Sequence, residues 1–175
     1  MERIWKIGYF SYDEGKNGYV GAILITNQFG LPLEFRYTDP ISLSPLQRLL
    51  YGEPLKKYLL VDIIGKTLWD AIQNKPDLLL VEDKIMFDMS KYTEVCPVGL
   101  LSKKADLGGD MGFSAIQFFE ASGKGGFIIF AKGERPRELI RDLISEAQQH
   151  MNIAEPFDRI RKVLSKLQEG RSVYD

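Results

Sequence analysis

The strongest constraint on the fold is a series of apolar segments, separated by turn formers, at the start of the chain. Residues 3–12 and 19–27 are rich in aromatic and β-branched side chains, which favour strands. In residues 31–38 apolar and polar side chains alternate, so one face of this segment should lie on the core. Turn-forming residues at 13–18 and a glycine-containing break at 28–30 separate the segments. We therefore predict a three-stranded antiparallel meander.

Helices should follow the meander. Ser44 and Gln47, with a proline between them, have the spacing of an N-cap and the third helical position of a capping box. A second amphipathic pattern begins at Pro54 and continues to about residue 74. The chain should also end in a pair of amphipathic helices, opened by Pro136 and Pro156.

Short apolar runs in the second half predict further strands at 78–81, 85–89, 95–101, 113–120 and 127–132. The chain has 175 residues, which fits one domain. We expect a single α+β domain over residues 1–175, with an antiparallel sheet and helices mainly on one face. The helix pair within residues 134–170 would form a cover or an appendage.

Charge and composition disfavour some classes of binding partner. Lys plus Arg number 23 and Asp plus Glu 24, a balance that disfavours nucleic acid as a partner. Apolar runs fall short of the ~18 residues that span a membrane, and the charged N-terminus is unlike a signal peptide. The single cysteine cannot form an internal disulfide, which fits a reducing compartment. These features predict a cytoplasmic protein without a membrane partner.

The residues that could belong to catalytic motifs each have a structural interpretation. Gly65-Lys66-Thr67 has the letters that end a P-loop, but Leu60 stands where that loop needs glycine, so we interpret the segment as helix. Cys96 and His150 are single copies; we interpret Cys96 as a buried apolar residue and His150 as a helix-terminal cation. One histidine and one cysteine cannot make a Cys/His zinc site. We therefore expect no catalytic group, metal or cofactor. A metal site made of carboxylates alone stays open, although no Asp/Glu spacing resembles an EF-hand loop.

A glycine-rich stretch at 122–126 is a weak phosphate candidate through Lys124, Gly125 and Gly126. Glycine allows close backbone approach to an anion, and lysine supplies charge. Strands should flank this stretch on both sides, which favours a hairpin turn instead.

Two features bear on RNA. Residues 126–130 match the last five positions of an RNA-recognition strand, where Phe127 and Phe130 would stack on bases. The preceding positions fail the pattern, so we favour core positions for both rings. Arg159, Lys162 and Lys166 share one helix face, which fits phosphate, an acidic partner or plain solvent.

The segment 31–52 carries the most concentrated polar pattern on an apolar background. Its candidate ligand or interface residues are Glu34, Arg36, Thr38, Gln47, Arg48 and Tyr51. Glu34 and Arg36 share a strand face, so the carboxylate can orient the guanidinium and leave some of its donors free. An arginine at such a corner suits a carboxylate or phosphate. The alternative is a solvated face with an ordinary ion pair.

Two segments in the first third of the chain resemble known families. The blocks PLEFRYTDP and LQRLLYG, within residues 31–52, resemble a family of bacterial proteins without an assigned activity. The stretch YVGAILITNQFGLPLEF resembles the first hairpin of roadblock and profilin-like domains, which mostly scaffold and dimerise. The second resemblance implies a scaffolding role.

From these observations we predict a non-enzymatic binding or adaptor module that self-associates, with protein or a second copy as its partner. A first alternative is an enzyme or regulator that binds a small anion through Arg36 and Arg48, with Glu34 or Asp39 as carboxylates. A second alternative is an RNA-binding protein.

Overall fold

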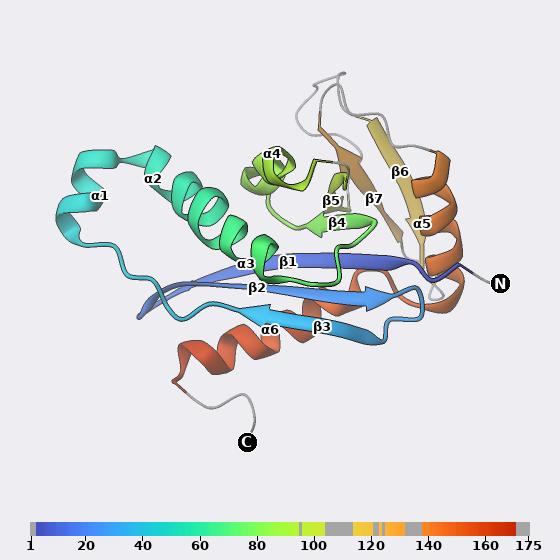
Figure 1. The fold of residues 1–175 in the computed structure, drawn as a ribbon, viewed down its shortest axis with the longest axis horizontal. Coiled ribbons are helices and arrows are strands. Elements are labelled where there is room, and N and C mark those ends of the chain that lie inside the picture. The colour runs from blue at the N-terminus through green and yellow to red at the C-terminus, as the bar shows by residue number, and fades with distance from the viewer. Residues whose placement is uncertain are drawn as a thin grey trace.

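The computed structural model describes residues 3–94, 96–103, 114–120, 123, 125–131 and 138–170. Within these described residues, seven strands form one sheet in the order β3-β2-β1-β4-β5-β7-β6 (Figure 1). The strands are β1 (Lys6–Gly15), β2 (Gly18–Asn27), β3 (Pro32–Tyr37), β4 (Leu78–Val81), β5 (Val98–Ser102), β6 (Ser114–Phe119) and β7 (Gly125–Phe130).

Helical segments fill the connections and the C-terminal part. They are α1 (Pro45–Tyr51), α2 (Glu53–Lys57), the π-helix η1 (Tyr58–Gly65), α3 (Lys66–Ala71), the 3₁₀ helix η2 (Lys84–Met89), α4 (Ser90–Thr93), α5 (Glu138–His150) and α6 (Glu155–Gln168). None of the described helices is long and apolar enough to span a membrane.

The predicted meander is confirmed. Strands β1 and β2 pair antiparallel from Lys6 opposite Asn27 to Gly15 opposite Gly18, and β3 pairs antiparallel with β2. Gly18 has a φ of 110°, a conformation that favours glycine and closes this tight turn. Strand β3 is an edge strand, so one of its sides is open to neighbours other than strands.

The expectation of an antiparallel sheet is wrong, because the sheet is mixed. Strand β4 pairs parallel with β1, Phe10 lying opposite Val81, and β5 pairs parallel with β4. Parallel neighbours need a long crossover, which the helices α1 to α3 supply between β3 and β4. The carboxyl ends of β1 and β4 therefore lie at the same end of the sheet.

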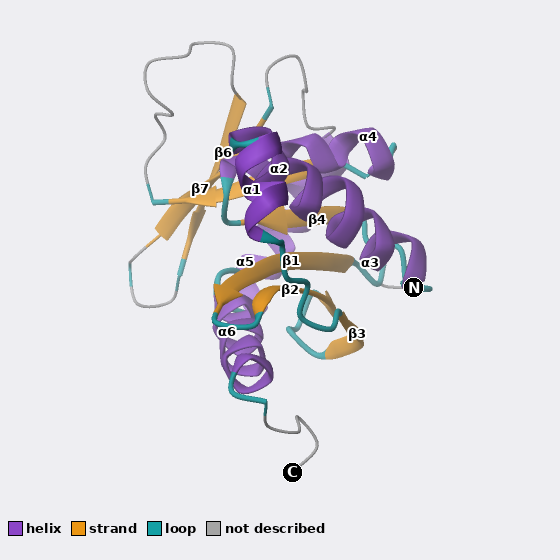
Figure 2. Cartoon of the chain, turned by 90° about the vertical axis from the view of Figure 1, so that its left-hand side faces the viewer, coloured by secondary structure: helices purple, strands orange, loops and turns teal. Residues whose placement is uncertain are grey.

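Helices also cover both faces of the sheet, and not mainly one as expected (Figure 2). One core lies between the sheet and the C-terminal helices α5 and α6, around Tyr9, Phe130 and Phe157. The other lies under η1, α3 and η2, around Phe10, Ile64 and Met89. The alternation along β1 divides its side chains between these two cores, since neighbours on a strand point to opposite faces.

The first predicted helix is confirmed, with its capping box. Ser44 accepts a hydrogen bond from the Gln47 backbone N–H, and the Gln47 side chain accepts one from the Ser44 N–H. The second helical pattern forms α2, η1 and α3 in succession. Gly65 lies in its interior, where an added Cβ would stand 2.3 Å from the Met89 sulfur. The Gly65-Lys66-Thr67 segment is therefore helix, and its glycine permits close packing.

The prediction of a strand at 85–89 is wrong, because this apolar run forms η2. Asp83 caps it by accepting a hydrogen bond from the Ile85 backbone N–H at 3.0 Å. Asp83 also follows β4 almost directly, so the cap bends the chain away from the sheet at the carboxyl end of that strand.

Candidate functional site

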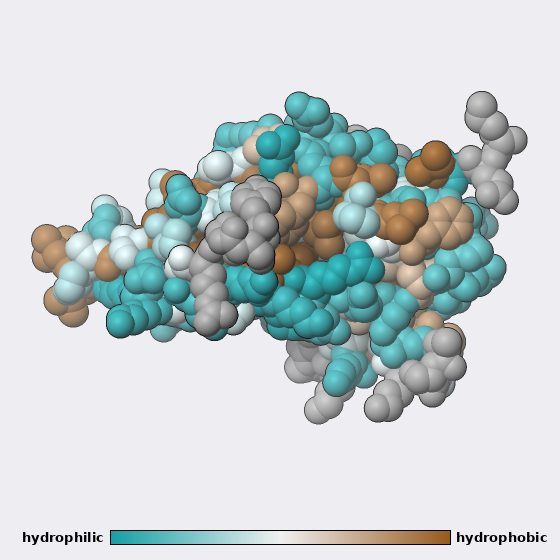
Figure 3. All heavy atoms as spheres, turned by 90° about the horizontal axis from the view of Figure 1, so that it is seen from below, coloured by the Kyte–Doolittle hydropathy of each residue, from teal (hydrophilic) through white to brown (hydrophobic). Residues whose placement is uncertain are grey.

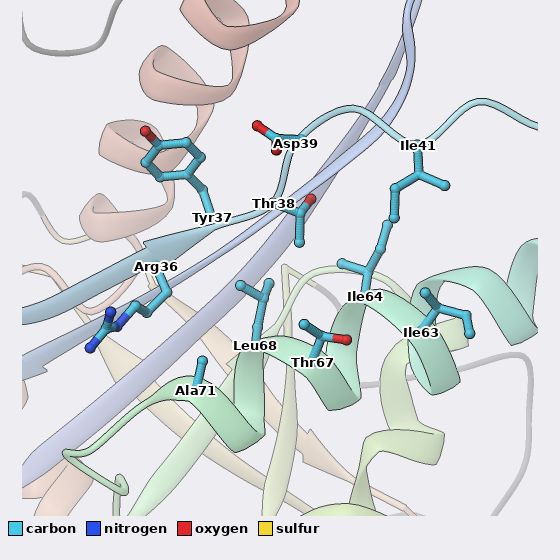
Figure 4. A pocket seen from close by; sticks show the side chains of 10 residues that line it. All are labelled: Arg36, Tyr37, Thr38, Asp39, Ile41, Ile63, Ile64, Thr67, Leu68 and Ala71. Atoms are coloured by element: carbon cyan, nitrogen blue, oxygen red, sulfur yellow. The ribbon is translucent and has the colours of Figure 1, made fainter.

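Two of the hollows that the described residues line lie beside the sheet. The first, which we call the Arg36 hollow, has a volume of about 450 Å³. Its walls are the end of β3 with the following loop and, opposite, η1 with α3 (Figure 4). The lining residues are Arg36, Tyr37, Thr38, Asp39, Ile41, Ile63, Ile64, Thr67, Leu68 and Ala71.

Glu34 fixes one end of this hollow. Its carboxylate is largely buried, with 10% of the side chain exposed. It accepts hydrogen bonds from the backbone N–H groups of Gln73 and Asn74, at 2.9 and 2.8 Å, and one from the Asn74 side chain. Glu34 thereby ties the edge strand β3 to the segment that follows α3.

These contacts also set the charge of Glu34. Burial by itself raises the pKa of the carboxyl, but hydrogen bonds from Asn74, Arg36 and Gln73 lower it to about 2. The carboxylate is therefore ionised throughout the physiological range, and it is available as a fixed partner for a cation.

Arg36 is that cation. Its Nε donates to a Glu34 carboxylate oxygen at 2.9 Å, and 45% of its side chain is exposed. Its two terminal nitrogens have no partner among the described residues. The pair expected from the strand spacing thus forms, and the outer edge of the guanidinium keeps donors for a ligand.

Only part of the predicted candidate set gathers here. Thr38 also lines the Arg36 hollow, where its hydroxyl oxygen accepts a hydrogen bond from the Gly21 backbone N–H. Gln47, Arg48 and Tyr51 lie on α1 and do not line the hollow. Gln47 is engaged in the capping box.

Helix α1 extends from the rest of the molecule and buries none of its residues. Its leucines and Tyr51 are exposed, and the leucines form the hydrophobic patch at the left of Figure 3. The exposed residues are Leu46, Leu49, Leu50 and Tyr51.

The second hollow, which we call the acidic hollow, has a volume of about 440 Å³ and lies at the carboxyl ends of β1 and β4. Four acids, a lysine and an arginine contribute to its lining, so negative side chains outnumber positive ones. The lining residues are Phe10, Ser11, Tyr12, Asp13, Glu14, Lys56, Glu82, Asp83, Met86 and Arg161.

Two of these acids are already engaged. Arg161 donates from one terminal nitrogen to both oxygens of Glu82, at 2.6 and 2.7 Å, and from the other to Asp158 at 2.6 Å. The hydrogen bond with Asp158, together with that to Glu82, raises the pKa of the Arg161 guanidinium. The Tyr12 hydroxyl donates to Asp83 at 2.5 Å. Burial, and then this bond, raise the pKa of Tyr12.

Sequence reasoning misses the acidic hollow. The sequence around Asp13 and Glu14, like that around Glu82 and Asp83, indicates only turns between strands. Both pairs lie at the carboxyl ends of apolar strands, and ligands of open α/β sheets bind outside the carboxyl ends of parallel strands. Acidic residues after two such strands are therefore the available signal, but it requires knowing that β1 and β4 are parallel.

The acids do not form a ready metal centre. Within the described residues, no group of three or more His, Cys, Asp or Glu side chains is arranged to hold a metal ion. Carboxylates can bind hard cations, but Glu82 and Asp83 are engaged by Arg161 and Tyr12.

Cys96 is buried and His150 lies at the end of a helix, the positions expected from the sequence. Cys96 is buried in the core beneath η1 and η2. His150 ends α5, and its ring lies 4.8 Å from that of Phe29. The two residues belong to helices and loops on opposite faces of the sheet.

The remaining candidate residues have structural roles or lie outside the residues that the structure describes. Lys124 is outside the described residues, while Gly125 and Gly126 begin β7. Phe130 is fully buried and Phe127 is partly buried, so both rings belong to the cores. Arg159 donates to the Gly30 carbonyl at 2.7 Å and so joins α6 to the β2–β3 turn.

The strand order and the helices on both faces resemble the ribonuclease H-like fold of endonuclease V. No family model matches the chain, and no curated protein does. Among solved structures, a variant of Ciona intestinalis endonuclease V in complex with a 23mer DNA matches with a TM-score of 0.51 and 10% identity, over 94% of this chain and 87% of that one. A second structure of that enzyme, with a 24mer DNA, matches with a TM-score of 0.50 and 10% identity, over 92% and 87%.

These likenesses overturn several expectations. The neighbours are nucleases in complex with DNA, which contradicts the prediction of a non-enzymatic, self-associating adaptor. They also contradict the expectation that nucleic acid is a disfavoured partner. That expectation relied on net charge, which averages over the whole surface.

Proposed function

We propose that this protein binds nucleic acid. The observation that carries the proposal is the likeness of nearly the whole chain to endonuclease V in complex with DNA. At 10% identity the likeness concerns the fold, so the residues of this chain must supply the contacts.

The two hollows support the proposal in different ways. The Arg36 hollow offers a guanidinium with donors to spare, and phosphate oxygens are acceptors that match its planar fork. The acidic hollow lies where ligands bind in sheets with parallel strands, but its surplus of acids repels phosphate. We therefore assign the phosphate contact to the Arg36 hollow.

Phosphodiester cleavage is a second candidate function, favoured by the carboxylates that line the acidic hollow. The described carboxylates do not form a metal-binding group, and two of them are engaged, so we derive no hydrolytic step. Gel analysis of labelled DNA and RNA, incubated with the protein and Mg²⁺ or Mn²⁺, tests this candidate. Products that are lost in Asp13→Asn or Asp83→Asn would support it, and intact substrate would exclude it for those cations.

Fluorescence anisotropy tests binding directly. Labelled single-stranded and double-stranded oligonucleotides of DNA and RNA are titrated with the protein at about 50 mM and about 200 mM salt. Contacts to phosphate release counterions, so we expect saturable binding that weakens as salt rises. The proposal fails if no oligonucleotide binds at the lower salt.

We also infer that the protein acts in the cytosol. Its single cysteine is buried and cannot form an internal disulfide, which fits a reducing compartment. Fractionation of source cells with immunodetection checks this inference, and recovery outside the cytosolic fraction would contradict it.

A further inference from the structure

We infer that the Arg36 hollow is a subsite for one nucleoside phosphate unit, with the phosphate on Arg36 and the nucleoside against the apolar wall. This inference rests on the proposed function and specifies where a strand would be held. It also applies to a free nucleotide, which has the same chemistry, and the experiment below separates the two sources.

Arg36 is held in one orientation by its ion pair with Glu34. Glu34 holds the guanidinium by its Nε alone, at 2.9 Å, so the edge with the two terminal nitrogens stays available. Glu34 cannot easily turn away, because backbone N–H groups of Gln73 and Asn74 hold its carboxylate. An arginine fixed before the ligand arrives loses little side-chain entropy on binding, and this favours affinity.

The shape and lining of the hollow match those of a ligand pocket. Figure 4 shows Arg36 at one end, beside Ala71, and Ile41 at the other, above Ile63 and Ile64. Leu68 and Thr38 point into the space between them. Ligand pockets have volumes of roughly 300–1,000 Å³ and mostly apolar linings with few polar groups. The volume of about 450 Å³ lies in that range.

The lining of the hollow carries little charge. Arg36 and Asp39 are its charged lining residues within the described part of the chain, and Glu34 lies behind the guanidinium, 2.9 Å from its Nε. In Figure 4 the Asp39 side chain points away from the helix wall, whereas the guanidinium lies at the end of the hollow beside Ala71. An anion at Arg36 therefore meets the unpaired edge of a guanidinium whose other edge is paired with Glu34, next to an apolar wall. This pattern fits a ligand with a negative end and an apolar, planar body.

The experiment compares variants in the oligonucleotide titration. Arg36→Gln removes the charge and should weaken binding about tenfold, the effect of losing a charge-assisted hydrogen bond of roughly 1.4 kcal/mol. Arg36→Lys keeps the charge without the fork and should recover only part of the affinity. Arg141→Gln, an exposed arginine on α5, is the matched control and should bind like the wild type.

A second variant tests the hollow without a change of charge. Ala71→Leu places a larger side chain opposite Arg36, at an exposed helical position that tolerates leucine. It should weaken binding several-fold with an unchanged melting temperature. Competition with adenosine monophosphate and with inorganic phosphate then separates the sources. Displacement by the nucleotide indicates that the hollow takes a free nucleotide, and displacement by neither competitor indicates that it needs a strand.

The outcomes separate this inference from the proposed function. If the wild type binds oligonucleotide but Arg36→Gln and Ala71→Leu bind equally well, the subsite is wrong while nucleic-acid binding stands. If inorganic phosphate displaces the oligonucleotide as well as the nucleotide does, the hollow recognises an anion only and the nucleoside assignment is wrong. If the wild type binds no nucleic acid, the proposed function fails and this inference fails with it.

Discussion

The two hollows contain similar groups but differ in how their charges are satisfied. In the acidic hollow, side chains engage one another, as Arg161 does with Glu82 and Tyr12 with Asp83. In the Arg36 hollow, the backbone satisfies most of the carboxylate of Glu34, which leaves the guanidinium only partly engaged. The difference indicates why Arg36 is available to a ligand: backbone N–H groups satisfy most of its carboxylate partner, so the guanidinium keeps unpaired donors.

The largest expected loss of stability comes from replacing Glu34, the carboxylate that orients Arg36. Glu34→Gln removes the negative charge that accepts hydrogen bonds from the segment after α3 and from Arg36. We expect the free energy of unfolding to fall by about 1–3 kcal/mol, because charged hydrogen bonds at a largely buried position are lost. Urea unfolding of both proteins measures this loss.

The control is Asp39→Asn, which changes an exposed carboxylate on the rim of the same hollow. It should alter the unfolding free energy by no more than about 0.5 kcal/mol. Equal effects of the two substitutions would show that Glu34 has no special structural role.

Because of the same carboxylate, the stability of the protein should depend on pH. The pKa of Glu34 is about 2 in the folded protein and ordinarily 4.5. The folded state thus binds the proton more weakly than the unfolded state, and the stability that Glu34 contributes is complete above about pH 4.5 and lost as pH falls toward 2. The difference between wild type and Glu34→Gln in urea unfolding should shrink over that window. A constant difference would contradict the assigned pKa.

A smaller effect is expected at Tyr12 in the acidic hollow. Tyr12→Phe removes the hydroxyl that donates to Asp83, while Asp83 still accepts from the Ile85 backbone N–H. We expect a loss of about 1 kcal/mol in the free energy of unfolding, the usual contribution of one hydrogen bond. Urea unfolding again measures the loss, and an unchanged unfolding free energy would show that this bond adds nothing to stability. Phe87→Leu, on η2 nearby, controls for apolar packing alone.

The smallest effect is expected at Arg161. It is half exposed, so its pairs with Glu82 and Asp158 are screened by water. Arg161→Gln should change the unfolding free energy by less than about 1 kcal/mol. It should also leave oligonucleotide affinity within about twofold, because this arginine is already engaged. A loss of affinity as large as that of Arg36→Gln would move the phosphate contact to the acidic hollow.

The features that could be predicted from the sequence are those that depend on residues close together along the chain. The meander follows from alternation and turn formers, and the capping box of α1 follows from Ser44 and Gln47. The Glu34–Arg36 pair was predictable because residues two apart on a strand share a face. All of these interactions form within a few residues along the chain or across a tight hairpin.

Interactions between distant residues were not predictable. The parallel pairing of Phe10 with Val81 joins segments far apart along the chain, and no local pattern specifies its direction. The acidic hollow depends on that pairing, so it was missed. The run at 85–89 is apolar like a strand, but Asp83 caps it as a 3₁₀ helix. No local pattern indicates that backbone N–H groups after α3 donate hydrogen bonds to Glu34.

Hydrogen exchange with and without a bound single-stranded oligonucleotide tests the central claim most directly. The account predicts slower exchange in residues 34–41 and 63–71, the two walls of the Arg36 hollow, and unchanged exchange in residues 10–14 and 82–86 around the acidic hollow. Slower exchange around the acidic hollow alone, or no change in either region at saturating oligonucleotide, would contradict it.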